Sequence, residues 1–166
     1  MKRIEARLLL PVMDRRCLTL QAMLGETSIT LGQFRMAVKR GNIGLPYADS
    51  QGSGHVTLYS LYDFLEILIY SEISKLGLPY KIKGHIHDRP ISFALMNVIS
   101  QYLHKISEGS IEHKHCIYYI DDNGASDIDI LTEDILDTKT SFVIFNFDIL
   151  LKKVLYLYYK YSSLFK

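Results

Sequence analysis

The sequence of 166 residues has few cysteines and no long apolar run, and both features narrow the classes of protein to consider. Its two cysteines, Cys17 and Cys116, cannot form a framework of disulfide bridges, and such a count is typical of a reducing compartment. The longest apolar stretches, Leu8–Val12 and Phe64–Tyr70, are too short to cross a bilayer, and the N-terminus lacks the pattern of a signal peptide. We therefore expect a soluble cytoplasmic protein that does not bind membranes.

Motifs that accompany common enzyme mechanisms are also missing. The sequence has no nucleophile elbow and no glycine-rich loop that would cradle a phosphate. Carboxylates gather between Asp121 and Asp134 in an acidic, turn-like stretch, but residues 121–125 do not follow the order of an EF-hand loop. We interpret this stretch as a solvated loop, and we expect a protein that is not an enzyme and needs no cofactor.

Two histidine clusters leave a metal site open as an alternative. They are His85-Ile86-His87-Asp88 and Glu112-His113-Lys114-His115-Cys116. Alternate residues of a strand point the same way, so each pair of histidines could supply two ligands. The spacing matches no strong zinc pattern, and polar histidines beside short strands are the preferred interpretation. The candidate ligands are His85, His87, His113, His115 and Cys116.

The composition, with 48% apolar and 22% charged residues, is ordinary for a packed globular protein, but the charge is unevenly distributed. Residues 1–42 hold eight basic and three acidic residues, a net charge of +5, so the remaining residues carry −4 of the total of +1. A basic front and an acidic rear suit a protein that docks one end on a polyanion, although chance clustering on a solvated surface explains them equally well.

The sequence of residues 1–41 predicts an arm and two helices. Residues 1–16 form an N-terminal arm that could be a short strand or could pack on a partner. A short helix is expected over Leu18–Leu24, ending at Gly25. After a polar turn, Ser28 or Thr30 caps a second helix that Gly41 stops. The apolar stripe of this second helix consists of Leu31, Phe34 and Val38.

A loop and two longer helices follow. Gly52-Ser53-Gly54 suits a hairpin tip, and its flanks, Ile43–Tyr47 and His55–Leu58, could pair as short strands. A long helix begins with an imperfect capping box of Ser60 and Asp63 and ends at Gly77. Another helix starts near Arg89 or Pro90 and ends at Gly109. The expected apolar faces are Leu61, Phe64, Leu65, Leu68, Ile69, Ile73 and Leu76, and then Ile91, Leu95, Val98, Ile99, Tyr102 and Ile106.

The tail differs in character from the helical part. Cys116–Ile120 and Ser141–Phe147 are β-rich runs, and Asp122-Asn123-Gly124 is a turn signal between them. From Asp148 the periodicity is helical, with Ile149, Leu150, Val154, Leu157 and Tyr161 on one face. The fold class expected is therefore α+β and mainly helical, with a small strand-strand-helix part at the C-terminus. We divide the chain into an arm (1–16), a DNA-binding part (17–108) and a dimerisation or partner-binding part (109–166).

The order of short helix, polar turn, second helix, glycine-rich hairpin and long helix is a winged helix-turn-helix plan. Residues 18–77 resemble the MerR-like DNA-binding domain. The resemblance rests on the segments Ile29–Arg35, Asn42–Pro46, Gly52–His55, Leu58–Asp63 and Leu76–Pro79, in that order. The chain departs from the family's pattern in lacking an arginine in the wing before Tyr59, and its tail does not predict the family's long coiled coil.

The resemblance implies that the second helix enters the major groove and that the wing contacts the DNA backbone. Thr30 and Gln33 would reach base edges, whereas Arg35, Lys39 and Arg40 would contact phosphates. His55, Thr57 and Tyr59 would touch the backbone from the wing, and Tyr59 could instead belong to the core. Arg15 and Arg16 extend the expected basic surface, with Arg3 and Arg7 of the arm.

The function expected from this pattern is sequence-specific binding of duplex DNA by a transcriptional regulator that forms a homodimer. The effector, if there is one, does not follow from the sequence. The alternative is a non-enzymatic adaptor that binds proteins on a helix-turn-helix-derived scaffold, since Tyr156, Tyr158, Tyr159, Tyr161 and Phe165 make the last helix aromatic.

Overall fold

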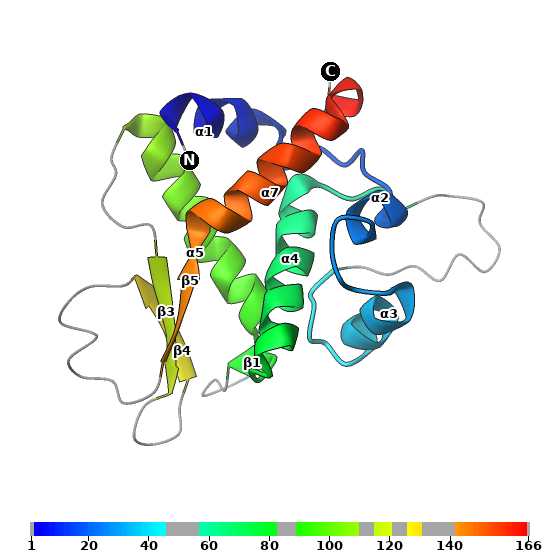
Figure 1. Cartoon of the computed structure of the whole chain (residues 1–166), viewed down its shortest axis with the longest axis vertical. Helices are drawn as coiled ribbons and strands as arrows, with labels where there is room; N and C mark the ends of the chain where they lie inside the picture. Colours follow the sequence, from blue (N-terminus) through cyan, green and yellow to red (C-terminus); the bar gives the residue numbers. More distant parts are fainter. Residues whose placement is uncertain are drawn as a thin grey trace.

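A computed structural model describes residues 2–45, 57–82, 89–109, 115–120, 126–130 and 142–165. The fold is mainly helical, with two small antiparallel sheets, and belongs to the α+β class (Figure 1). The helical elements are α1 (Arg3–Leu9), η1 (Leu10–Val12), α2 (Leu20–Leu24), α3 (Leu31–Lys39), α4 (Leu61–Leu76), α5 (Ile91–Glu108), α7 (Phe147–Lys160) and η2 (Ser162–Phe165). The strands are β1 (Lys81–Ile82), β2 (Arg89–Pro90), β3 (His115–Ile120), β4 (Ser126–Ile130) and β5 (Phe142–Asn146).

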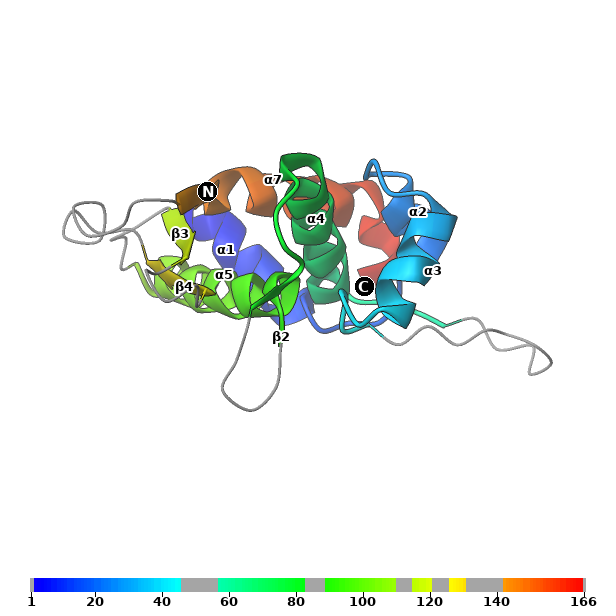
Figure 2. The same ribbon diagram turned by 90° about the horizontal axis from the view of Figure 1, so that it is seen from below.

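Helix α4 lies in the middle of the molecule. Helices α5 and α7 pack against it, whereas α2 and α3 lie at one end and the sheet of β3, β4 and β5 lies at the other (Figures 1 and 2). Ten of its 16 residues are buried, including Glu66 and Ser71. None of the helices among the described residues is long and apolar enough to cross a membrane.

Of the two N-caps that the sequence allows for α3, the structure has Thr30, and the Ser60–Asp63 capping box expected for α4 is confirmed. Thr30 and Gln33 form a reciprocal capping box at α3, and Ser60 and Asp63 form one at α4. Each box satisfies amide groups of the first turn that have no partner within the helix. Three glycines with positive φ, Gly41, Gly77 and Gly109, follow α3, α4 and α5, as the sequence predicts.

The N-terminal arm is helical, and the expectation of a short strand is wrong. Ala6 and Leu9, one turn apart on α1, are both buried, and α1 packs against α5. The exposed side carries Arg3 and Arg7, whose guanidinium groups reach the end of α5. A run of leucines before Pro11 fits a strand in isolation, but burial on α5 selects the helix.

Three residues assigned to apolar faces are exposed instead. Leu31 in α3, Leu76 at the end of α4 and Ile149 in α7 all face solvent. In α3 the buried positions are Phe34 and Ala37, so the buried stripe is rotated away from Leu31. In α7 the buried face is formed by other residues, which are Phe147, Leu150, Leu151, Val154, Leu155 and Leu157.

The C-terminal sheet has the order β4-β3-β5 and is antiparallel throughout. The β-rich runs of the sequence are confirmed as β3 and β5, although Phe147 begins α7. Strand β4 corrects the prediction of an acidic turn over its residues. Its sequence Ser-Asp-Ile-Asp-Ile alternates polar and apolar residues, and Ile128 packs against the core from this edge strand.

The parts on either side of residue 109 share one hydrophobic cluster. Helix α7 contacts both α4 and α1, and Val154 and Phe165 belong to the same cluster as Leu9 and Phe64. The division of the chain into functional parts at residue 109 stays a prediction.

The contact between α1 and α5 predicts a measurable loss of stability on removing two arginines. Arg3 donates from Nε to Ser107 O (3.2 Å) and from Nη2 to Glu108 O (3.0 Å), and Arg7 Nε donates to Ser107 O (2.9 Å). These cations satisfy carbonyl groups at the negative end of the helix dipole. The double variant Arg3→Ala/Arg7→Ala is expected to lower the free energy of unfolding by about 1 kcal/mol in urea titrations, since the contacts are exposed.

The matched control is Arg16→Ala, which removes an exposed arginine from the same region of sequence. An equal loss in the control would show that the carbonyl contacts of Arg3 and Arg7 contribute nothing.

Candidate nucleic-acid interface

A backbone bridge ties the segment before α2 to the segment before α4. Leu18 N donates to Tyr59 O (3.0 Å), and Tyr59 N donates to Leu18 O (2.8 Å). The chain therefore leaves this bridge along α2 and α3 and returns to it directly before the Ser60 cap of α4. Because both ends of the segment are fixed at one point, α2, the turn and α3 are held against α4.

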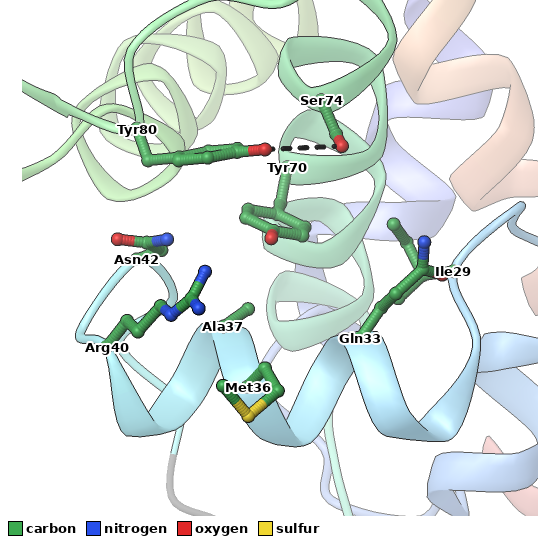
Figure 3. Close-up of a pocket in the computed structure, with 9 residues that line it drawn as sticks. All are labelled: Ile29, Gln33, Met36, Ala37, Arg40, Asn42, Tyr70, Ser74 and Tyr80. Carbon is green, nitrogen blue, oxygen red and sulfur yellow. Dashed lines mark hydrogen bonds between the residues drawn. The ribbon is translucent and has the colours of Figure 1, made fainter.

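Helix α3 buries one face and exposes two others. Phe34 and Ala37 are buried. Gln33, Met36 and Arg40, spaced at i, i+3 and i+7, line a pocket toward α4 (Figure 3). Gly32, Arg35 and Lys39, with the same spacing, form a separate exposed stripe. The site residues expected on this helix thus divide between two faces.

The two residues expected to read bases are exposed but engage each other. Gln33 Oε1 accepts hydrogen bonds from Thr30 N (2.8 Å) and Thr30 Oγ1 (3.0 Å), while Thr30 Oγ1 accepts from Gln33 N (3.2 Å). The carbonyl end of the Gln33 side chain is therefore committed to the helix cap, and its amino end is the group left to contact a ligand.

The three cations expected to contact phosphates, Arg35, Lys39 and Arg40, are all exposed. Between residues 27 and 45 the sequence contains these cations and no acidic residue. Lys39 and Arg40 make no ion pair within the described part of the chain. Lys39 and Arg40 therefore add positive charge to the surface of α3, and positive charge attracts a polyanion.

The structure describes only the ends of the expected wing. The glycine-rich tip and His55 lie outside the described residues, and the described ends of the flanks, 43–45 and 57–58, are not strands. Thr57 is half-buried. Tyr59 is only 2% exposed, so its side chain belongs to the core and is not among the proposed DNA contacts.

The arginines of the N-terminal region are exposed, and three of them also bond to backbone carbonyl groups. Arg15 Nη1 donates to Phe165 O (2.6 Å) at the end of η2, and Arg3 and Arg7 bind the end of α5. Arg16 is exposed and lines a second pocket with Asp14 and Asp63. Carbonyl groups therefore engage part of this basic surface, and two carboxylates lie close to Arg16.

Glu66 of α4, which the sequence analysis does not single out, is buried and bonds to two other segments of the chain. It is 2% exposed, and its Oε1 accepts from Gly44 N (2.7 Å) and from Ser92 Oγ (3.1 Å). These bonds tie the segment after α3 and the start of α5 to α4. Burial raises the pKa of Glu66, the bonds from Gly44 and Ser92 oppose this, and the charge of Asp63 adds to the rise.

The metal candidates do not come together in the described residues. His85, His87 and His113 lie outside them, as does the side chain of Cys116. His115 Nε2 lies 3.1 Å from Asn146 Nδ2, on the neighbouring strand β5. No group of three or more potential metal ligands occurs where side chains are described.

A scan against protein-family models found no match to the chain, and a search of curated proteins found none. The resemblance to the MerR-like domain thus rests on the order of its sequence motifs and stays a prediction.

The buried carboxylate of Glu66 predicts a pH dependence of stability. Because its pKa is raised in the folded state, the native protein binds a proton more readily than the unfolded chain above the ordinary value of 4.5. The contribution of Glu66 to stability is therefore greatest below that value and declines as pH rises through the raised pKa. In the variant Glu66→Gln, whose side-chain oxygen can accept the same two bonds, urea titrations between pH 4 and pH 8 are expected to lack this decline.

The control Glu108→Gln removes an exposed carboxylate at the end of α5 and is expected to keep the wild-type pH profile. Parallel pH profiles for wild type and Glu66→Gln would contradict the assignment.

Proposed function

We propose that the protein binds duplex DNA with α3 in the major groove. The observation that carries the proposal is that α3 buries only Phe34 and Ala37 and presents a cationic, acid-free surface away from the core. A helix of nine residues is about 14 Å long and, with side chains, about as wide as the major groove of about 12 Å.

The exposed residues of α3 supply both kinds of contact that such binding needs. Arg35 and Lys39, on the outer stripe, are positioned to neutralise phosphates on one side of the groove. Leu31 is 43% exposed at the beginning of the helix, where a recognition helix meets base edges, and an exposed apolar side chain there suits the methyl group of thymine. The amino end of Gln33 is a hydrogen-bonding group in the same first turn, on the face toward α4.

The Leu18–Tyr59 bridge supports the same proposal. It joins the residues before α2 to the residue before the Ser60 cap of α4, so the two ends of the segment that contains α3 and the expected wing are fixed at one point. In this proposal the protein is a MerR-like transcriptional regulator, with Thr30, Thr57, Arg15 and Arg16 at the edge of the contact surface.

Removing the outer cations of α3 is expected to weaken binding to every duplex. We expect Arg35→Ala/Lys39→Ala to lower affinity for random duplex DNA by roughly tenfold or more at low salt. The slope of log affinity against log salt should fall by about one to two, since each lost phosphate contact releases about one counterion fewer. Fluorescence anisotropy at several salt concentrations measures both quantities.

The control variant Lys105→Ala/Lys152→Ala removes the same charge from exposed positions on α5 and α7. If it weakens binding as much as the α3 variant, the effect reflects net charge and α3 is not the contact surface.

The outer face of α7 supports a homodimer, which would bring two copies of α3 to two half-sites. Ile149, Tyr156 and Tyr159 are exposed on this helix, and aromatic residues are favoured at interfaces. Lys153 and Lys160 on the same face pair with Glu72 and Glu26 of the same chain, so their charges are partly balanced.

Light scattering coupled to gel filtration tests the dimer. The wild type is expected at twice the chain mass of 19.1 kDa, and Ile149→Glu/Tyr156→Glu at the mass of one chain. Phe93→Glu, at an exposed apolar position on α5, is the control and should remain dimeric. A wild-type monomer at high protein concentration would contradict the proposed dimer.

The same face of α7 favours the second candidate function, a protein-binding adaptor without DNA binding. Two measurements, of partner binding and of DNA binding, distinguish the two functions. An adaptor would lose its partner on substitution of Ile149 and Tyr156, and it would show no salt-dependent binding of duplex DNA that depends on Arg35 and Lys39.

A further inference from the structure

A pocket of about 160 Å³ lies between α3, the end of α4 and the residue before β1 (Figure 3). Most of the side chains around it are polar. Those that carry the argument are Gln33, Arg40, Asn42, Tyr70, Ser74 and Tyr80. They come from separate elements, so the pocket is formed only when α3 is seated on α4.

Two of the polar residues are buried and fixed in place. Asn42 is 8% exposed; its backbone N donates to Ala37 O (2.9 Å) and its backbone O accepts from Ser92 Oγ (3.3 Å). Tyr70 is 7% exposed, and its ring stacks on that of Tyr80 with centroids 5.1 Å apart. A buried polar side chain beside an open pocket is a group ready to bond to a ligand.

Two tyrosines place hydroxyl groups beside the pocket. Burial and the neighbouring Tyr80 raise the pKa of Tyr70, while Asn42 and the charge of Arg40 oppose this. The Tyr80 hydroxyl lies 3.4 Å from Ser74 Oγ at the rim. A phenol hydroxyl can donate a hydrogen bond to a ligand.

The charge around the pocket has one sign. Arg40 is the charged residue among those lining it, and no acidic side chain of the described residues does so. A second cation stands close by, since Lys81 Nζ lies 3.6 Å from where a Cβ on Gly41 would be. An arginine fork with hydroxyl and amide donors is the arrangement that recognises phosphate and carboxylate groups.

We propose that this pocket binds an oxyanion group, a phosphate or a carboxylate, with Arg40 as the charged partner and Asn42, Tyr70 and Tyr80 as donors. The volume has room for a phosphate or a carboxylate group. A cation would meet no carboxylate among the described residues that line the pocket, and an apolar ligand would meet mostly polar side chains.

An oxyanion group that fits this pocket could come from two sources. The group could belong to a small molecule free in solution, or it could be a phosphate of the DNA backbone, in which case the proposal rests on the DNA binding proposed above. Because α3 forms one wall, an occupied pocket would stabilise the seating of α3 in either case.

Titration with inorganic phosphate, in the absence of DNA and at constant ionic strength set with sodium chloride, tests the proposal by calorimetry. We expect saturable binding to the wild type, at least tenfold weaker in Arg40→Ala and intermediate in Arg40→Lys, which keeps the charge and loses the fork. Tyr80→Phe, which keeps the stacked ring, should weaken binding severalfold. Lys152→Ala removes an exposed cation of α7, outside both the pocket and the proposed DNA surface, and is the control, expected within twofold of wild type.

A second titration, with the protein saturated by a short duplex, identifies the source of the anion. Phosphate binding that is lost in the presence of duplex indicates a backbone phosphate, and binding that persists indicates a free anion; both support the pocket. Absence of saturable phosphate binding to the free wild type, or an equal loss in Arg40→Ala and Lys152→Ala, would overturn the proposal whether or not the protein binds DNA.

Discussion

The structure depends on the burial of α4. Helices α5 and α7 pack against it, and Phe34 and Ala37 of α3 belong to the same hydrophobic cluster as its buried residues. Apolar burial alone would not orient α3, because the hydrophobic effect is non-directional. Polar contacts supply the direction: the Leu18–Tyr59 bridge fixes the ends of the α2–α3 segment, and Glu66 fixes Gly44 directly after it.

This arrangement divides the positive charge of the protein into two kinds. Arg3, Arg7 and Arg15 bind carbonyl groups at the ends of α5 and η2, where they hold helices together. Arg35, Lys39 and Arg40 stand on a short helix with no acidic residue between positions 27 and 45. The net charge of the first 42 residues therefore overstates the surface that can meet a polyanion, and α3 is the part of it whose cations have no acidic residue close to them in the sequence.

Local signals in the sequence were sufficient for helix ends, because capping boxes and glycines act within one turn. Thr30 with Gln33, Ser60 with Asp63, and the three positive-φ glycines are examples. Features set by contacts distant in sequence were not predictable: α1 is helical because it lies on α5, and β4 pairs with β3 in spite of its acidic residues. The same holds for the site. The cations of α3 could be named from the sequence, whereas Asn42, Tyr70 and Tyr80 converge only through tertiary packing, and no spacing marks them.

The most direct test of the proposed function is to map the surface that duplex DNA touches. Amide chemical shifts of the full chain, followed by NMR during titration with a duplex, report each contacted residue separately. We predict that the largest changes fall on residues 31–42, with smaller ones near Thr57 and Arg16. Changes confined to α7 or to the β3–β5 sheet, or no saturable change at low salt, would contradict α3 as the DNA-binding helix.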